Sequence, residues 1–239
     1  MKETIYTIPI NDAFNSDCGC PFCFIQKKLD DEKTDAAVGA AMMEPDHRQV
    51  SNEKGFCREH IVKMHQKQKV LPLALVMQSY IDTKNNEIFS LFDKNAEKKG
   101  FFSKASAKET AGEIINTLNR QSKSCAICDE LNYQLDRYAA NTVDMWKSDS
   151  EFKSRFAEKS FCTQHLELIL SAAVKRLNDK EFDEFFSVIK SASKKRMTEL
   201  YGDITDFVNS FDYRFSGELS DSAKNAVKAC IKNYFGADV

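Results

Sequence analysis

One spacing of metal-ligating side chains occurs twice in this chain of 239 residues. Each copy reads C-x2-C-x33-C-x2-H, and the second begins 105 positions after the first (125 − 20). The first set is Cys20, Cys23, Cys57 and His60, and the second set is Cys125, Cys128, Cys162 and His165. A spacing preserved at positions that all carry good metal ligands indicates an internal duplication with a shared local geometric requirement.

The duplication extends beyond the ligands. Residues 53–57 (EKGFC) match residues 158–162 (EKSFC) at the same offset. Further on, Ala107-Lys108 aligns with Ala223-Lys224 at an offset of 116 (223 − 107), which indicates an insertion near 201–213. Loops and helix ends absorb insertions most easily. We therefore predict a first helical repeat over 1–122 and a second over 123–239, either as two domains or packed as one.

Composition favours helices over strands. The chain has only 8 Gly and 4 Pro and is rich in Lys, Glu, Ala and Leu, and it lacks alternating strand patterns. In the first repeat we expect helices near 21–43, 46–53, 57–69, 72–98 and 104–121. In the second we expect them near 126–146, 149–158, 162–178, 180–210 and 219–235. The predicted fold class is all-α, with two tandem pseudo-symmetric helical-bundle repeats, each with a CxxC/CxxH site at helix N-termini. In the second repeat, Phe182, Phe185, Phe186 and Ile189 have the spacing of one buried helix face.

The spacing of each ligand pair suits zinc. Residues at i and i+3 lie on one side of a helical turn, so a CxxC and a CxxH can each direct two ligands at one ion. Three thiolates and one imidazole form a tetrahedral set that zinc favours, and four protein ligands leave no open position for a substrate. We therefore expect two structural zinc sites, one stapling the first and third helices of each repeat, and no catalytic residues.

Other interpretations of the eight ligands stay open. An iron–sulfur cluster with one His ligand is chemically reasonable, and buried Cys and His can also be ordinary core residues. Cys20-Pro21-Phe22-Cys23 is similar to the active-site motif of glutaredoxins, which would make the chain a thiol-based redox protein. In that fold a strand precedes the motif, whereas here a turn does, and Pro21 is better explained as the first residue of a helix.

The other cysteines and histidines lie outside the repeated spacing. Cys18 reads as a turn residue and Cys230 as part of an apolar helix face. His47 and His65 have no histidine counterparts in the second repeat, so we do not expect them to bind metal.

The net charge and the cysteine content limit the possible partners of the protein and its cellular compartment. A net charge of −2 argues against a dedicated nucleic-acid binder. The N-terminus resembles neither a secretory signal nor an anchor, and the longest apolar run, 70–77, is too short to span a bilayer. We expect a cytoplasmic protein with a protein partner and no membrane association, in which the six cysteines of the repeated spacing serve metal or redox chemistry.

Several phrases together resemble a known family. These are Cys20-Pro21-Phe22-Cys23, Gly55-Phe56-Cys57-Arg58-Glu59-His60, Cys125-Ala126-Ile127-Cys128-Asp129 and Phe161-Cys162-Thr163-Gln164-His165. Over essentially its whole length the chain resembles an uncharacterised family of bacterial proteins, largely from anaerobic Gram-positive species, with paired CxxC…FCxxH motifs. Members often carry the label of an ABC-transporter substrate-binding protein, which makes transport-associated solute binding an alternative function. The resemblance implies no catalytic residues. The expected function is that of a zinc-binding helical protein, an interaction or regulatory module.

Overall fold

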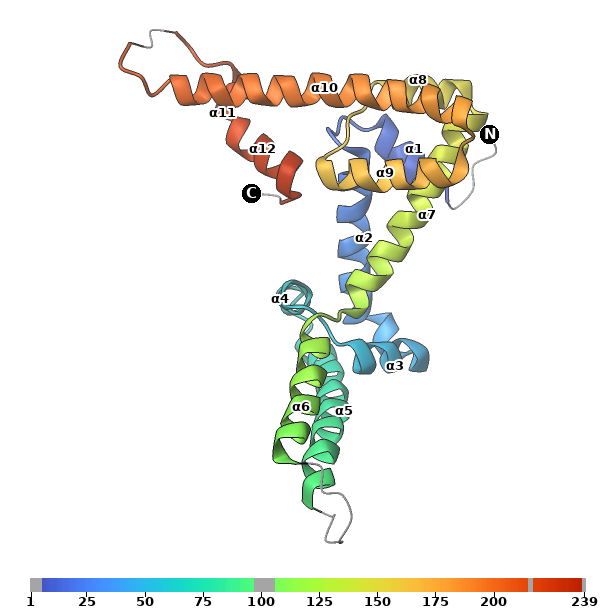
Figure 1. The fold of residues 1–239 in the computed structure, drawn as a ribbon, viewed down its shortest axis with the longest axis vertical. Coiled ribbons are helices and arrows are strands. Elements are labelled where there is room, and N and C mark those ends of the chain that lie inside the picture. The colour runs from blue at the N-terminus through green and yellow to red at the C-terminus, as the bar shows by residue number, and fades with distance from the viewer. Residues whose placement is uncertain (1–5, 97–105, 215–216, 238–239) are drawn as a thin grey trace. The chain divides into compact units, whose positions relative to one another are not determined.

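The computed structural model describes residues 6–96, 106–214 and 217–237, and throughout these ranges regular structure is helical (Figure 1). The first helices are α1 (Ile8–Asn15), α2 (Pro21–Ala37), the 3-10 helix η1 (Ala40–Met43), α3 (Pro45–Lys54), α4 (Arg58–Gln66), α5 (Val70–Ala96) and α6 (Ala107–Ser122). The others are α7 (Ala126–Ser148), α8 (Ser150–Ala157), α9 (Thr163–Arg176), α10 (Asp179–Asn209), α11 (Asp221–Lys224) and α12 (Ala226–Phe235). The described residues contain no strand, so the predicted all-α class is confirmed.

Most predicted helices lie within a few residues of the observed ones, with three differences. The predicted helix 21–43 is α2 followed by η1, because Gly39 leaves helical geometry at φ −131° and ψ −128°. The predicted helix 219–235 is α11 and α12, which meet at Asn225. Helix α1 was not predicted. Parts of the predicted helices 72–98 and 104–121 lie outside the described residues.

The chain forms two compact units that do not follow the predicted repeats. Unit 1 comprises residues 1–28 and 133–239, and unit 2 comprises residues 29–132. The boundaries fall inside α2 and α7. Each unit therefore combines residues from both predicted repeats. The predicted boundary at 122/123 separates the two copies of the motif along the sequence, and it is not a boundary between the two units.

Unit 1 is built around an aromatic core. Helix α1 contributes Phe14, whose ring lies 4.9 Å from Phe152 and 5.7 Å from Phe156 between centroids. Phe156 in turn lies 5.1 Å from Phe185, which meets the edge of Trp146 at 4.9 Å. These five rings are at most 2 % exposed. Burial of such side chains contributes roughly 1.5–3 kcal/mol each, so this cluster contributes substantially to the stability of the unit.

The predicted buried face of α10 is only partly correct. Phe185 and Ile189 are buried, but Phe186 is 43 % exposed. Its ring stacks on Phe182 at 5.9 Å, so the two phenylalanines cover each other at the edge of the core.

Unit 2 has a smaller core, in which α3 and α6 both pack on α5. Val76 and Leu91 are the buried apolar residues of α5 that the structure describes. Glu87 of α5 accepts hydrogen bonds from Arg120 (2.7 Å) and Gln121 (3.1 Å) of α6, so these helices lie side by side and antiparallel (Figure 1). Within the described residues, no helix combines the length and the apolarity needed to cross a bilayer.

Gly55 closes α3 in a backbone conformation that favours glycine. Its φ is +68°, and a Cβ atom built there would lie 2.7 Å from the ring of Tyr80. The turn matters because Gly55 lies two residues before the ligand Cys57, and its carbonyl accepts a hydrogen bond from the N–H of Ala126 at 2.9 Å.

We predict that Gly55→Ala lowers the free energy of unfolding by roughly 1–3 kcal/mol, because it forces a positive φ and a clash with Tyr80. The matched control is Gly112→Ala in α6, where a Cβ meets nothing within 4 Å. There the substitution should raise the free energy by roughly 0.5–1 kcal/mol. Denaturant titration measures both, and equal effects of the two substitutions would contradict the prediction.

Candidate metal sites

All four ligand pairs open helices, as predicted. Cys57 and Cys162 are the N-cap residues of α4 and α9. The carbonyl of Cys20 accepts hydrogen bonds from the first turn of α2, and that of Cys125 accepts one from the first turn of α7. Free N–H groups and the partial positive charge of a helix N-terminus stabilise a thiolate, so these positions lower the proton cost of metal binding.

The structure gathers the eight ligands into two groups. Site 1, in unit 1, consists of Cys20, Cys23, Cys162 and His165. Site 2, in unit 2, consists of Cys57, His60, Cys125 and Cys128. In each group one ligand atom per residue lies within 4.8 Å of the others. The prediction that each repeat staples its own helices is therefore wrong: the CxxC of one repeat meets the CxxH of the other.

Helix lengths accompany this exchange of partners. In each repeat the CxxC opens the longer of two successive helices: α2, with 17 residues, runs about 25 Å at 1.5 Å per residue, and α3, with 10 residues, runs about 15 Å. The same order holds for α7 and α8, with 23 and 8 residues. Each CxxC thus opens a long helix that leads the chain away from it before the CxxH of the same repeat is reached.

In site 1, the Nδ1 atom of His165 faces three sulfur atoms. It lies 3.1 Å from Sγ of Cys162, 3.4 Å from that of Cys23 and 3.6 Å from that of Cys20. The sulfur atoms of Cys23 and Cys162 are 3.6 Å apart.

Site 2 has the same arrangement. Nδ1 of His60 lies 3.2 Å from Sγ of Cys57 and 3.3 Å from each sulfur of Cys125 and Cys128. The sulfur atoms of Cys57 and Cys128 are 3.8 Å apart.

These separations fit one tetrahedral ion per site. With metal–sulfur bonds of about 2.3 Å and a metal–nitrogen bond of about 2.0–2.1 Å, tetrahedral angles separate two sulfurs by about 3.8 Å and sulfur from nitrogen by about 3.6 Å. The observed distances are 3.1–3.8 Å. All eight cysteines are free, so the sulfur atoms are available as ligands.

In the absence of metal, the ligands of each site share protons. Burial alone would lower the pKa of His60, but hydrogen bonds with Cys125 and Asp30 raise it to about 9. Burial likewise opposes charge on His165, whose hydrogen bonds with Cys162 and Cys20 raise its pKa to about 9. Each imidazolium thus lies beside a thiolate.

The thiols divide into two kinds. In site 1, hydrogen bonds with Cys20 and Cys23 lower the pKa of Cys162. In site 2, burial opposes ionisation of Cys125, but its hydrogen bond with His60 lowers the pKa of this thiol to about 6. In contrast, the hydrogen bond with Cys162 raises the pKa of Cys23, and burial raises that of Cys128. A metal ion must displace protons from the latter two, so binding releases protons.

The surroundings of the two histidines differ, and the sequence analysis missed this. In site 2, Nε2 of His60 lies 2.8 Å from a carboxylate oxygen of Asp30, whose other oxygen accepts from Lys63 at 2.5 Å. A carboxylate behind a ligating histidine fixes the ring and raises its basicity. The residue 105 positions after Asp30 is Leu135. In site 1 the ring of Phe22 lies 5.8 Å from that of His165, which gives this site an apolar wall.

The remaining cysteines and histidines are outside both sites. Cys18 donates a hydrogen bond to the carbonyl of Ala13 at 3.3 Å, in the turn where it was predicted. Cys230 is half-buried rather than part of the core. His47 and His65 are exposed and belong to neither group of four ligands.

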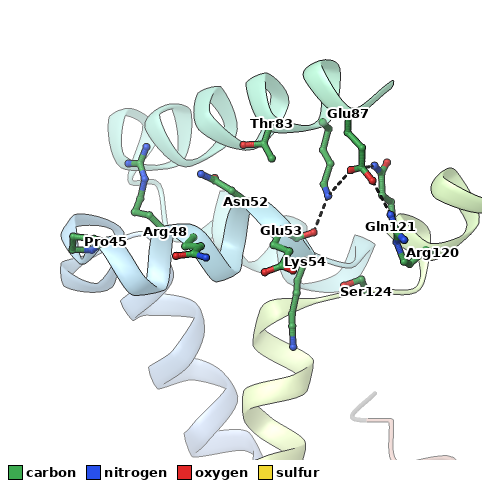
Figure 2. Close-up of a pocket in the computed structure, with 12 residues that line it drawn as sticks. Pro45, Arg48, Asn52, Glu53, Lys54, Thr83, Glu87, Arg120, Gln121 and Ser124 are labelled. Atoms are coloured by element: carbon green, nitrogen blue, oxygen red, sulfur yellow. Dashed lines mark hydrogen bonds and ion pairs between the residues drawn. The ribbon is translucent and has the colours of Figure 1, made fainter. Parts of the chain in front are cut away.

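Unit 2 also has a polar groove of about 990 Å³ between α3, α5 and the end of α6 (Figure 2). Figure 2 shows Thr83 and Glu87 on the side of α5 that faces the groove, with Arg120 and Gln121 opposite Glu87. Three of the four cations that line the groove are paired, Lys84 and Arg120 with Glu87 and Lys54 with Asp129, and Arg48 donates a hydrogen bond to the carbonyl of Met42. This pairing makes the groove a solvated ionic contact between helices.

The fold and the two clusters define an all-α protein with two Cys3His groups able to bind metal. A family model described as "Family of unknown function (DUF6062)" matches residues 1–238, so the chain belongs to this family. Neither the comparison with curated proteins nor that with solved structures found a match.

We predict that Asp30→Ala weakens metal binding at site 2 by about 10–100-fold, because His60 loses the carboxylate that orients it. Site 1 serves as an internal control, because its His165 lies against the ring of Phe22 and not against Asp30. Competition with a chromophoric chelator resolves the two affinities, and equal loss at both sites would contradict the assigned role of Asp30.

Proposed function

We propose that the chain is a zinc-binding helical protein in which each Cys3His site holds one structural zinc ion, and that it acts as an interaction or regulatory module. One observation carries the proposal: in both sites the Nδ1 atom of a histidine lies 3.1–3.6 Å from three sulfur atoms. Three thiolates and one imidazole are a donor set that zinc favours.

The same distances favour a single ion over an iron–sulfur cluster. In a cluster, several iron atoms each take their own protein ligands, so those ligands lie around a larger body. Here all four ligand atoms of a site lie within 4.8 Å of one another, which matches ligands that share one ion.

A structural role follows from the number of ligands. Four protein ligands complete a zinc tetrahedron, so no position remains for a water molecule or a substrate. The metal instead joins two helix N-termini in each unit, α2 with α9 in unit 1 and α4 with α7 in unit 2. This supports a binding module over an enzyme.

The expected partner is another protein. A net charge of −2 and ion-paired cations offer little to a polyanion. The all-α fold of the described residues also gives no support to the two α/β lobes that a transport-associated solute-binding protein would have. We place the protein in the cytoplasm, because a reducing compartment keeps the ligand thiols free.

We predict that protein purified without added metal is colourless and contains two zinc ions per chain by elemental analysis. A visible absorption band with bound iron would contradict the zinc proposal and support the iron–sulfur alternative.

We also predict that Cys162→Ser removes one zinc ion and lowers the melting temperature by about 10 °C or more, because metal binding and folding are coupled. Cys18→Ser is the matched control. Its hydroxyl can keep the hydrogen bond to Ala13, and Cys18 belongs to neither site, so zinc content and melting should stay unchanged. Unchanged melting and zinc content in Cys162→Ser would show that site 1 is not structural.

A further inference from the structure

The α5–α6 pair in unit 2 exposes large apolar side chains. Phe89 and Phe92 of α5 are each 55 % exposed, and Ile81 is 47 % exposed. On α6, Ile115 is 57 % and Leu118 49 % exposed. Single exposed apolar residues are ordinary, but a contiguous set of this size marks an interaction surface.

Helical periodicity places Ile81 and Phe92 on a side of α5 that points away from the groove. Thr83 and Glu87 occupy the groove side of α5 (Figure 2). Ile81, Ile88 and Phe92 follow one another at i, i+7 and i+11, so they share a different side of the helix.

The register of the two helices completes this face. Glu87 bonds to Arg120 and Gln121, and the helices are antiparallel. Counting along both helices from that contact places Leu118 level with Phe89, and Ile115 level with Phe92. Ile115 and Leu118 are three residues apart and lie together on α6. Four exposed apolar side chains therefore occupy two successive levels of the pair.

The exposed side of α5 also follows a coiled-coil repeat. Positions 71, 74, 78, 81, 85, 88 and 92 alternate spacings of three and four, and carry Leu, Ala, Gln, Ile, Asn, Ile and Phe. Such a seam is used to pack against another helix. Within unit 2, however, Leu71 is 69 % exposed at one end of the seam and Phe92 55 % at the other.

We propose that this face binds the same face of a second copy of the chain, so that two α5–α6 pairs form a four-helix bundle. Half-exposed side chains of this size present roughly 100 Å² each, so the five residues supply on the order of 500 Å² per chain. The smallest specific interfaces bury about 600 Å² per partner, a value that Leu71 and Ile88 of the same seam bring within reach. Four-helix bundles bury apolar faces of this kind.

The polar residues of the seam favour self-association over insertion into lipid. Gln78 and Asn85 lie in line with Ile81 and Phe92. A carboxamide both donates and accepts hydrogen bonds, so the carboxamides of another copy can satisfy it, whereas hydrocarbon cannot. A polar residue at one position of such a seam also fixes the register and the number of helices.

This inference rests on the proposed role as an interaction module and names its partner. It requires a folded unit 2 but not a particular metal. Zinc content is therefore measured on every sample, so that a failure of the zinc assignment is seen separately from a failure of the dimer.

The test is the mass of the purified full chain by light scattering after size exclusion. A dimer of the 27.2 kDa chain is expected at protein concentrations above about 10 µM. Phe92→Glu combined with Leu118→Glu places carboxylates in the bundle core and should give a monomer. Both side chains are about half exposed in the single chain, so the variant should keep its zinc content and its circular dichroism.

The matched control is Phe211→Glu, which changes a 78 % exposed phenylalanine of unit 1 and should remain a dimer. A monomeric wild-type chain would overturn the proposal, and so would a dimer that survives the double substitution or that dissociates in the control. A monomer that binds phosphatidylserine-containing vesicles through Phe92 and Leu118 would also overturn it, by assigning the face to lipid.

Discussion

The fold depends on two sets of four ligands that segments far apart in sequence bring together. Cys20 and His165 are 145 residues apart, and Cys57 and Cys128 are 71 residues apart. Bringing such distant segments together costs loop-closure entropy, which the binding of the proposed ion would offset. Because each ligand pair opens a helix, a fixed site also fixes the directions in which two helices leave it. The aromatic core of unit 1 and the helix contacts of unit 2 are built on these starting points.

The two sites share a ligand geometry but differ in what surrounds them. Site 1 adjoins the aromatic core through Phe22, which lies near both His165 and Phe161. Site 2 has Asp30 behind its histidine and a surface ion pair between Lys54 and Asp129 beside it. A duplication would supply the ligands twice, while substitutions such as Asp30 against Leu135 would make the sites differ. We therefore expect metal affinity to depend on the apolar wall in unit 1 and on the carboxylate of Asp30 in unit 2.

Local features could be predicted from the sequence, and long-range pairing could not. The eight ligands and the helices that they open follow from i, i+3 spacing, which is set within one turn. The pairing was wrong because a duplicated motif can form its tetrahedron in two ways, and ligand chemistry is the same in both. The spacing of the ligands along the chain does not decide between the two, and the pairing is seen only in the folded structure. Helix α1 was missed because its eight residues, with Pro9 at the start, have too short an apolar pattern to recognise. The role of Asp30 was missed because it depends on the packing of α2 against α4, which brings the carboxylate of Asp30 to His60.

The exchange of ligand pairs between repeats is the central claim, and the zinc content of two double variants tests it most directly. Cys20→Ser with Cys162→Ser alters one site in this structure, so that protein should retain one zinc ion per chain. Cys20→Ser with Cys57→Ser alters both sites, so that protein should retain none. If each repeat instead held its own ion, the second variant would retain one ion and the first would lose both, and that result would contradict the account.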